Sequence, residues 1–273
     1  MKLFAKFQSA VVTRWRTITQ YIRCSPGIAV CRPWLLAALV RTRLLRGSSV
    51  GTLEIPMDAR GESVIRLDTS SGSEMDIFQE VVVCGNYPID KLPFVPVLVA
   101  DCGANVGFFS GLARLSFPGA EIFAWEPDEQ NFRRLSDQPV LQGARASLAN
   151  AAVSDHAGRV SLTGVGHGCE VKGEADDSGG VECIDFGAWW HEHARSHALL
   201  KMDIEGHETA VLPALRGIWK APCAVFLETH APHGADDELI NQLEDDGFRV
   251  ELLRAHSLPN EERVFREYLA LLG

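Results

Sequence analysis

The fold is decided by residues 97–110, which read Val97-Leu-Val-Ala-Asp101-Cys-Gly103-Ala-Asn105-Val-Gly107-Phe-Phe-Ser110. A short apolar run ends in an acid, and two glycines four residues apart precede an apolar stretch that favours a helix. This pattern predicts a strand, a tight loop and a helix. Glycines lack a Cβ atom, so such a loop turns sharply and lets a ligand approach the first N–H groups of the helix.

A second strand that ends in an acid follows at residues 121–126, Glu121-Ile-Phe-Ala-Trp-Glu126. An acid at the end of the second strand is suited to binding the hydroxyls of a ribose. The glycine loop and Glu126 together predict a site for a nucleoside cofactor at the carboxyl edge of a parallel sheet.

Strand and helix patterns alternate from Pro96 to the end of the chain, and alternating βα units are typical of a parallel sheet covered by helices on both faces. The sequence therefore predicts an α/β fold. The expected fold is a Rossmann-like, doubly wound, mostly parallel seven-stranded sheet with one antiparallel edge strand. The expected strands are 97–101, 121–125, one within 144–153, 197–203, 223–228, 248–253 and 263–271. The expected helices are 108–115, 128–137, 184–195, 208–215 and 236–246.

The chain is expected to have three parts. Residues 1–48 form a basic helical N-terminal extension, residues 49–95 a small lead-in or cap segment, and residues 96–273 the cofactor-binding domain. The lead-in contains two alternating stretches within 50–69 that predict a small β element, then a short helix with a serine cap. Residues 156–180 are rich in Gly, Asp and Glu and are expected to form a turn, a short strand and a mobile loop.

The net charge of −10 is unevenly distributed. The first 46 residues hold nine of the 26 Lys and Arg and none of the 36 Asp and Glu, which leaves 17 basic and 36 acidic residues for the rest. An acidic body argues against nucleic acid as a partner. The basic arm, residues 1–46, suits peripheral contact with a membrane or another anionic surface, but packing against the protein's own acidic body is the favoured interpretation.

The seven cysteines are scattered and form no CxxC pair, so neither a zinc site nor a redox pair is indicated. Several lie within apolar runs, as reduced buried cysteines do. This usage favours a cytoplasmic location, with peripheral membrane association through the basic arm left open. The longest apolar run of the arm, residues 34–40, is too short to span a bilayer, and no convincing signal peptide is present.

The loop after the first strand reads D-x-G-x-N-x-G and lacks the third glycine of a dinucleotide fingerprint. The acid at Asp101 would repel a pyrophosphate but suits a cationic ligand. S-adenosylmethionine is such a ligand, because it carries an ammonium and a sulfonium, and Asp101 is expected to orient that end directly or through water.

A second acidic stretch, Lys201-Met-Asp203-Ile-Glu205-Gly206-His-Glu208, ends the fourth strand. Lys201 and Asp203 point to the same face of a strand, and Asp203 reaches the crevice in which open α/β sheets bind ligands. Asp203 or Glu205 is expected to take a proton from a substrate hydroxyl, although positioning of the acceptor matters as much as basicity. Helix capping by Glu205 and Glu208, and a salt bridge for Lys201, are the structural alternatives.

His230 follows the fifth strand at the same edge and has an ordinary pKa suited to a general base, so it joins the catalytic candidates. Asp203, Glu228 and His230 also offer oxygen and nitrogen donors for a divalent metal. Because no close ligand spacing in the sequence supports a metal, none is predicted.

The chain resembles the FkbM-type family of S-adenosylmethionine-dependent methyltransferases. The resemblance rests on residues 99–110, on 124–128, on Asn150-Ala-Ala152-Val-Ser154-Asp155 and on the 200–208 stretch, which occur in the family's order. It implies a class I methyltransferase fold and methyl transfer, usually to oxygen. His207 stands where the family often has a small residue, and 156–180 fits no family pattern.

The resemblance also implies a role for each cofactor-binding residue. Asp101, Gly103, Asn105 and Gly107 would hold the methionine and ribose part of S-adenosylmethionine, and Glu126 its ribose hydroxyls. Ala152 and Val153 would lie near the adenine.

The leading hypothesis is therefore an S-adenosylmethionine-dependent methyltransferase that methylates a hydroxyl on a small molecule, sugar or glycan. An oxidoreductase that uses a nicotinamide dinucleotide is one alternative, and Asp101 and Asn105 argue against its phosphates. A non-catalytic cofactor-binding protein is the other, and the intact acids Asp101, Glu126 and Asp203 argue against it. The sequence does not predict the oligomeric state.

Overall fold

The computed structural model describes residues 51–57, 63–68, 70–143, 145–163, 170–174, 180–230, 236–257 and 264–273. The chain divides into two compact units, Met1–Pro88 and Ile89–Gly273, whereas the boundary expected from the sequence lies at 95/96. The predicted basic extension, residues 1–48, lies outside the described residues. Within the described residues, no helix has the length and apolar character needed to cross a membrane.

The first unit contains the small β element expected before the main domain. Strands β1 (Thr52–Pro56) and β2 (Val64–Asp68) pair antiparallel. Helix α4 (Gly72–Ile77) begins after Ser71, whose hydroxyl accepts a main-chain N–H of the first turn, and continues as the π-helical segment Phe78–Cys84. The predicted β pair is confirmed, and so is the short helix, although the sequence placed its start at Ser73 and the capping serine is Ser71.

The second unit is built on a seven-stranded sheet of order β12-β13-β11-β10-β3-β4-β5. All pairs are parallel except those made by β13, so the predicted fold class is confirmed. The antiparallel strand does not lie at the edge, however. It lies between β11 and β12, because the chain returns from β12 as a hairpin into the space next to β11. The strands are β3 (Leu98–Cys102), β4 (Glu121–Trp125), β5 (Ala146–Ala149), β10 (Ala198–Met202), β11 (Cys223–Thr229), β12 (Arg249–Ser257) and β13 (Val264–Leu272).

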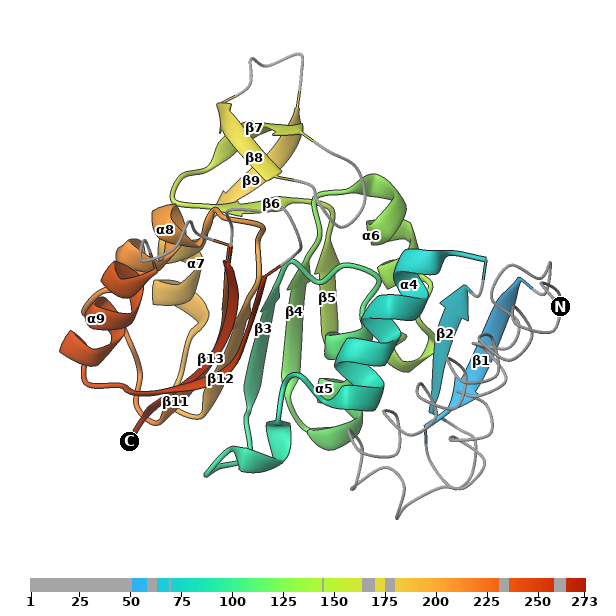
Figure 1. The fold of residues 1–273 in the computed structure, drawn as a ribbon, viewed down its shortest axis with the longest axis horizontal. Helices are drawn as coiled ribbons and strands as arrows, with labels where there is room; N and C mark the ends of the chain where they lie inside the picture. The colour runs from blue at the N-terminus through green and yellow to red at the C-terminus, as the bar shows by residue number, and fades with distance from the viewer. Residues whose placement is uncertain are drawn as a thin grey trace, which may run out of the picture. The chain divides into compact units, whose positions relative to one another are not determined.

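Helices cover both faces of this sheet (Figure 1). One face carries α5 (Phe108–Ser116) and α6 (Glu129–Ser136), and the other carries α7 (Phe186–His193), α8 (Glu208–Val211) and α9 (Asp237–Asp245). Alternate residues of β3 pack with the α7–α9 layer in one hydrophobic core, so the residues between them face α5. Short 3₁₀ turns complete the unit at Ile89–Lys91, Pro139–Leu141 and Leu212–Leu215.

A four-stranded sheet of order β6-β9-β7-β8 lies beyond the carboxyl end of β5 (Figure 1). Its strands are β6 (Ala152–Ser154), β7 (Gly158–Thr163), β8 (Glu170–Glu174) and β9 (Val181–Asp185). This sheet corrects three expectations. The strand expected within 144–153 is two strands, β5 and β6, in different sheets. The segment 156–180 contributes two strands, and the helix expected from residue 184 begins at Phe186, because β9 continues to Asp185, which caps the helix.

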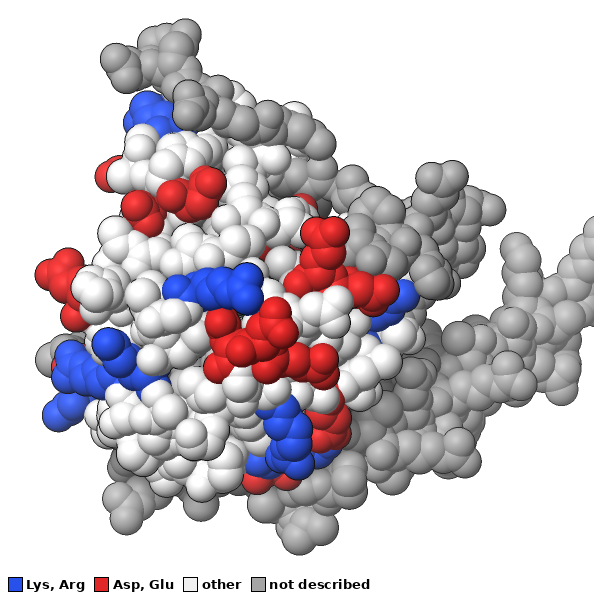
Figure 2. All heavy atoms as spheres, turned by 90° about the vertical axis from the view of Figure 1, so that its left-hand side faces the viewer, with Lys and Arg blue, Asp and Glu red and all other residues white. Residues whose placement is uncertain are grey.

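Acidic side chains dominate one side of the surface. Helix α9 lies on the side of the molecule shown in Figure 2 and carries Asp237, Glu238, Glu244 and Asp245. On this face the largest coloured patch is acidic, and basic side chains lie in separate groups around it (Figure 2). Among the described residues, this face shows no continuous basic surface of the kind that binds a nucleic-acid backbone.

Candidate functional site

The loop after β3, residues 103–107, depends on backbone conformations that favour glycine. Gly103 and Gly107 have φ angles of 76° and 88°, and Asn105 has a φ of 51°, a region that asparagine tolerates better than most residues. A Cβ atom on Gly103 would lie 1.9 Å from the main-chain oxygen of Asp203. The missing side chain therefore lets the loop after β10 lie directly against the loop after β3.

Glu126, at the end of β4, is bound to the same loop. Its carboxylate accepts the N–H of Asn105 at 2.8 Å and the N–H of Asp128 at 2.9 Å. Burial raises the pKa of Glu126 to about 7, although these two hydrogen bonds act in the opposite direction. The sequence therefore correctly predicted that the glycine loop and this acid meet at one edge of the sheet.

Asp101 is fully buried beneath the loop. It accepts a hydrogen bond of 2.6 Å from the hydroxyl of Ser110, and its other oxygen lies 3.5 Å from the ammonium of Lys201. Burial raises its pKa, and the nearby Lys201 opposes that rise. The expectation that Asp101 touches a ligand directly needs correction, because no part of this side chain reaches the surface.

Lys201 connects Asp101 to the ligand-facing main chain. Residues 101 and 201 are direct partners in the parallel pair β3–β10, so their side chains share one face. The ammonium donates to the carbonyl oxygens of Gly103 at 2.6 Å and Cys102 at 3.3 Å, and lies 3.3 Å from Asp203. Burial alone would lower the pKa of Lys201, but Asp203 and Asp101 raise it above its ordinary value, so the side chain is charged. From the sequence, Lys201 was expected only to form a salt bridge.

Ala152 and Val153 lie in β6 and are buried. The connection that leads to them is tied to the end of β4, because the amide of Asn150 donates to the carbonyl oxygens of Glu126 at 2.8 Å and Pro127 at 3.0 Å. Asn150 was not among the predicted site residues. Its position immediately after β5 was the signal that could have identified it.

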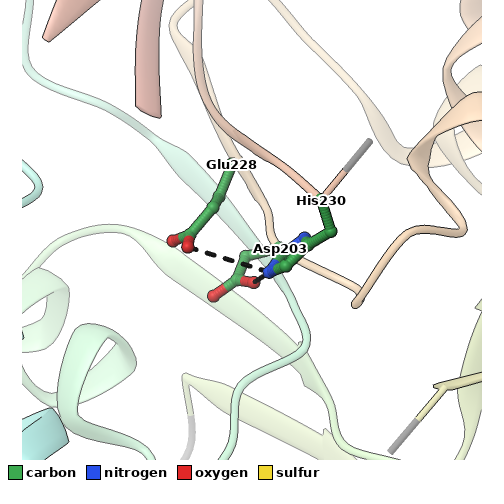
Figure 3. A group of neighbouring side chains, drawn as sticks. All are labelled: Asp203, Glu228 and His230. Atoms are coloured by element: carbon green, nitrogen blue, oxygen red, sulfur yellow. Dashed lines mark ion pairs between the residues drawn. The ribbon is translucent and has the colours of Figure 1, made fainter. Parts of the chain in front are cut away.

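Five side chains gather where β10 and β11 end. His230 is 5% exposed, and its Nε2 atom lies 3.6 Å from Asp203, 3.5 Å from Glu205 and 3.7 Å from Glu228. Its Nδ1 atom lies 3.2 Å from Glu208. Figure 3 shows the imidazole pointing toward the carboxylates of Asp203 and Glu228. The three predicted catalytic residues, Asp203, Glu205 and His230, are thus brought together.

Glu208 holds this arrangement in place from the start of α8. One of its oxygens accepts the N–H groups of Ile204 at 2.9 Å and Gly206 at 3.2 Å, as well as contacting His230. The turn that these bonds close contains Glu205 in a left-handed conformation, with a φ of 57°. The helix-capping role considered for Glu208 is therefore not seen, because these N–H groups precede α8 and no described side chain caps its first turn. The turn that Glu208 closes aims Glu205 at His230.

The electrostatics of the cluster change the role of His230. Burial alone would lower its pKa, but the hydrogen bond to Glu208 and the charge of Asp203 raise the pKa to about 10. An imidazolium ring already carries a proton on each nitrogen at neutral pH and has no lone pair left to accept another, so the general-base role expected for His230 needs correction. Burial and the neighbouring Asp203 raise the pKa of Glu205 to about 7 and that of Glu228 well above its ordinary value.

This geometry defines a class of protein: an α/β fold of Rossmann type with a cofactor loop at the point where the strand order reverses. The chain leaves β3 toward β4 on one side and reaches β10 and β11 on the other. The loop is flanked by the carboxylates of Glu126 and Asp203, which suit a cationic ligand and disfavour a pyrophosphate. S-adenosylmethionine fits this donor set.

Comparison with known proteins agrees with this class. The methyltransferase FkbM domain matches residues 101–250, more than half of the chain. Methyltransferase sdnD of Sordaria araneosa is 28% identical over 226 residues, which cover 68% of this chain and 86% of that protein. A methyltransferase FkbM structure from Methylobacillus flagellatus KT is 18% identical with a TM-score of 0.45, covering 72% of this chain and 53% of that one. Magnesium protoporphyrin IX methyltransferase from Synechocystis PCC 6803, solved with bound S-adenosylmethionine, is 13% identical with a TM-score of 0.42, covering 74% and 82%.

The chain belongs to the methyltransferase FkbM domain family. It is a methyltransferase, and its cofactor is S-adenosylmethionine.

Proposed function

We propose that the protein transfers a methyl group to a hydroxyl oxygen of a small molecule, sugar or glycan. One observation carries this proposal. The partly exposed carboxylates of Asp203 and Glu205 stand beside the cofactor loop, since the main-chain oxygen of Asp203 occupies the space that a Cβ on Gly103 would fill. Carboxylates in that place can orient a hydroxyl and accept its proton.

The cofactor is assigned to the residues around the glycine loop. Gly103, Asn105 and Gly107 hold its methionine and ribose part, and Glu126 accepts from the ribose hydroxyls. Asp101 acts as a positioning residue, because its charge reaches the loop only through Lys201. The buried strand β6, with Ala152 and Val153, forms the adenine side through apolar contact.

The acceptor is assigned to the ends of β10 and β11. When bound, S-adenosylmethionine supplies a methyl group on a positively charged sulfur atom, which a nucleophilic oxygen can take. Glu205 accepts the hydroxyl proton, since its side chain, at 30%, is more exposed than that of Asp203 at 24%, Glu228 at 17% or Glu208 at 2%. Asp203 orients the hydroxyl, and His230 holds both carboxylates in place.

Calorimetry with two cofactors tests the cofactor class and this division of roles. Wild-type protein is expected to bind S-adenosylmethionine and not NAD. The Glu126→Ala variant is expected to weaken S-adenosylmethionine binding by at least about tenfold, since it removes the ribose acceptor. Asp203→Asn is expected to change that affinity by less than about threefold and to lower methyl transfer roughly 100-fold.

Glu129→Ala on α6 is the matched control, because Glu129 is an exposed carboxylate three residues after Glu126 whose partner is the exposed Arg133. Equal losses of affinity in Glu126→Ala and Asp203→Asn would contradict the assignment. Mass-spectrometric screening of small metabolites and glycans for the mass gain of one methyl group identifies the acceptor, and products methylated only on nitrogen or carbon would contradict O-methylation.

A further inference from the structure

The strongest unexplained feature of the site is the environment of His230 Nε2. This atom makes no hydrogen bond with any described residue, and carboxylate oxygens of Asp203, Glu205 and Glu228 surround it at 3.5–3.7 Å. His230 is 5% exposed, and the ring of Phe265 packs edge-on against the imidazole, with the two ring centroids 5.3 Å apart. Water therefore has little access from that side to separate these charges.

The other ring nitrogen determines what Nε2 can do. The Glu208 oxygen that faces Nδ1 also accepts two main-chain N–H groups, so it acts as an acceptor toward all of its neighbours. Nδ1 therefore donates its proton to Glu208, and the ring is held with Nε2 facing the three carboxylates. Negative charge on three sides requires a positive charge at this point, either a proton on Nε2 or a metal ion that takes the proton's place.

We propose that Asp203, Glu228 and His230 bind one divalent cation at the ends of β10 and β11. Their three donor atoms lie within 4.8 Å of one another (Figure 3). Two atoms that bind one ion at about 2.1 Å lie no more than about 4.2 Å apart. Rotation of the partly exposed side chains of Asp203 and Glu228 brings the three donor atoms within this shorter distance.

The surrounding contacts match those of a metal site. A metal-binding histidine usually donates its second N–H to a carboxylate, as His230 does to Glu208. The second oxygen of Asp203 pairs with Lys201 at 3.3 Å, and the first lies 3.6 Å from Nε2 of His230, on the side of the proposed ion. Two carboxylates and one imidazole suit Mn²⁺, which accepts both oxygen and nitrogen, better than Ca²⁺.

A bound cation would also select the acceptor through its open coordination positions. Three protein ligands leave open positions on a six-coordinate ion, and an acceptor hydroxyl can fill one of them beside the cofactor loop. This part of the inference rests on the proposed function, whereas the cation site itself does not. An acceptor with two neighbouring oxygens is the class that such an ion would hold best.

Mn²⁺ binding to the full-length protein, stripped of metal by a chelator and free of cofactor and acceptor, tests the site. Electron paramagnetic resonance is expected to show one bound Mn²⁺ per chain, displaced by excess Mg²⁺. Asp203→Asn is expected to weaken binding at least tenfold, and the double variant Asp203→Asn Glu228→Gln to abolish it. In pulsed spectra, His230→Ala is expected to remove the signal of a directly bound nitrogen.

Glu192→Gln, a change at an exposed carboxylate of α7, is the control and is expected to bind Mn²⁺ as the wild type does. Thermal unfolding establishes that each variant is folded, and calorimetry with S-adenosylmethionine on the same samples reports the cofactor site separately. No Mn²⁺ uptake by wild type, or uptake that Asp203→Asn and the double variant leave unchanged, would show that a proton occupies Nε2 and would overturn the inference. If the wild type takes up no Mn²⁺ but still binds S-adenosylmethionine, the inferred metal site is wrong and the proposed cofactor site is unaffected.

Discussion

Lys201 contacts both parts of the site, the cofactor loop after β3 and the carboxylates at the end of β10. Its ammonium binds the main chain of the cofactor loop and lies between Asp101 on one side and Asp203 on the other. A buried charge with such partners costs several kcal/mol to leave unpaired, so all three residues depend on one another. The buried carboxylate of Asp101 therefore supports the loop from below.

Gly103 shows how closely the two loops approach. We expect Gly103→Ala to destabilise the fold by about 3 kcal/mol, because the new methyl group would collide with the main chain at Asp203 and the residue has a φ of 76°. Urea unfolding followed by circular dichroism measures this loss. Gly119→Ala is the control, since a Cβ there meets nothing within 4 Å; similar losses in both variants would contradict the steric argument.

Glu126 predicts a pH dependence of stability in the absence of cofactor. Its pKa is about 7 in the fold against an ordinary value of 4.5. The unfolded chain therefore releases this proton first, and wild type loses stability relative to Glu126→Gln as the pH rises from about 4.5 to 7. The full difference, about 3 kcal/mol, is present above pH 7.

Urea unfolding of both proteins at pH 5, 6, 7 and 8 measures this difference, and the shared titrations of other groups cancel. A difference in unfolding free energy that stays constant over this range would show that the carboxylate titrates normally.

At the scale of elements, Asp236 joins three parts of the fold. It is fully buried before α9 and accepts hydrogen bonds from Thr229 of β11 at 3.3 Å and from Tyr268 of β13 at 2.8 Å, as well as from Arg266. Burial would raise its pKa, but the hydrogen bonds from Arg266 and Tyr268 lower it below the ordinary value. Its contribution to stability is therefore present above the ordinary pKa and is lost as the pH falls through the lowered one.

We expect Asp236→Asn to lower the free energy of unfolding at pH 7 by roughly 2–4 kcal/mol, because it removes the charge that the partly buried Arg266 pairs with and weakens the buried hydrogen bonds. The effect should shrink as the pH is lowered toward 3. Chemical unfolding at both pH values measures it, and the exposed neighbour Asp237→Asn should cost less than about 1 kcal/mol. A loss at pH 3 equal to that at pH 7 would rule out the ionised carboxylate as the cause.

The four-stranded sheet is the element that local patterns did not reveal. Residues 144–153 read as containing one strand, yet the chain turns at Asn150, and β6 pairs with β9, about thirty residues further on. The residues of β6 are too few to show a period of their own. Their pairing is a long-range contact that short windows of sequence cannot detect.

At the scale of the whole molecule, the order of elements followed from hydrophobic periodicity. The strands ending at Asp101 and Glu126, the glycine loop between them and the helices around the sheet could all be predicted, because local propensity and alternation specify them. The position of β13 could not, since both an edge strand and an inserted strand satisfy the same alternation. Hydrogen bonding to β11 and β12 on its two sides decided between them.

In the candidate site, too, some features follow from the local sequence and others only from the folded structure. Glycine conformations and acids at strand ends are local properties, so the amino-acid sequence alone was enough to identify the cofactor class. The pairing of Lys201 with Asp101 depends on the register of β10 against β3, where a shift of one residue would turn the side chain to the opposite face. The carboxylates around His230 come from the turn after β10, from β11 and from the start of α8, which meet only in the folded chain. Burial alone would lower the pKa of the imidazole, but the hydrogen bond to Glu208 and the charges of these carboxylates raise it.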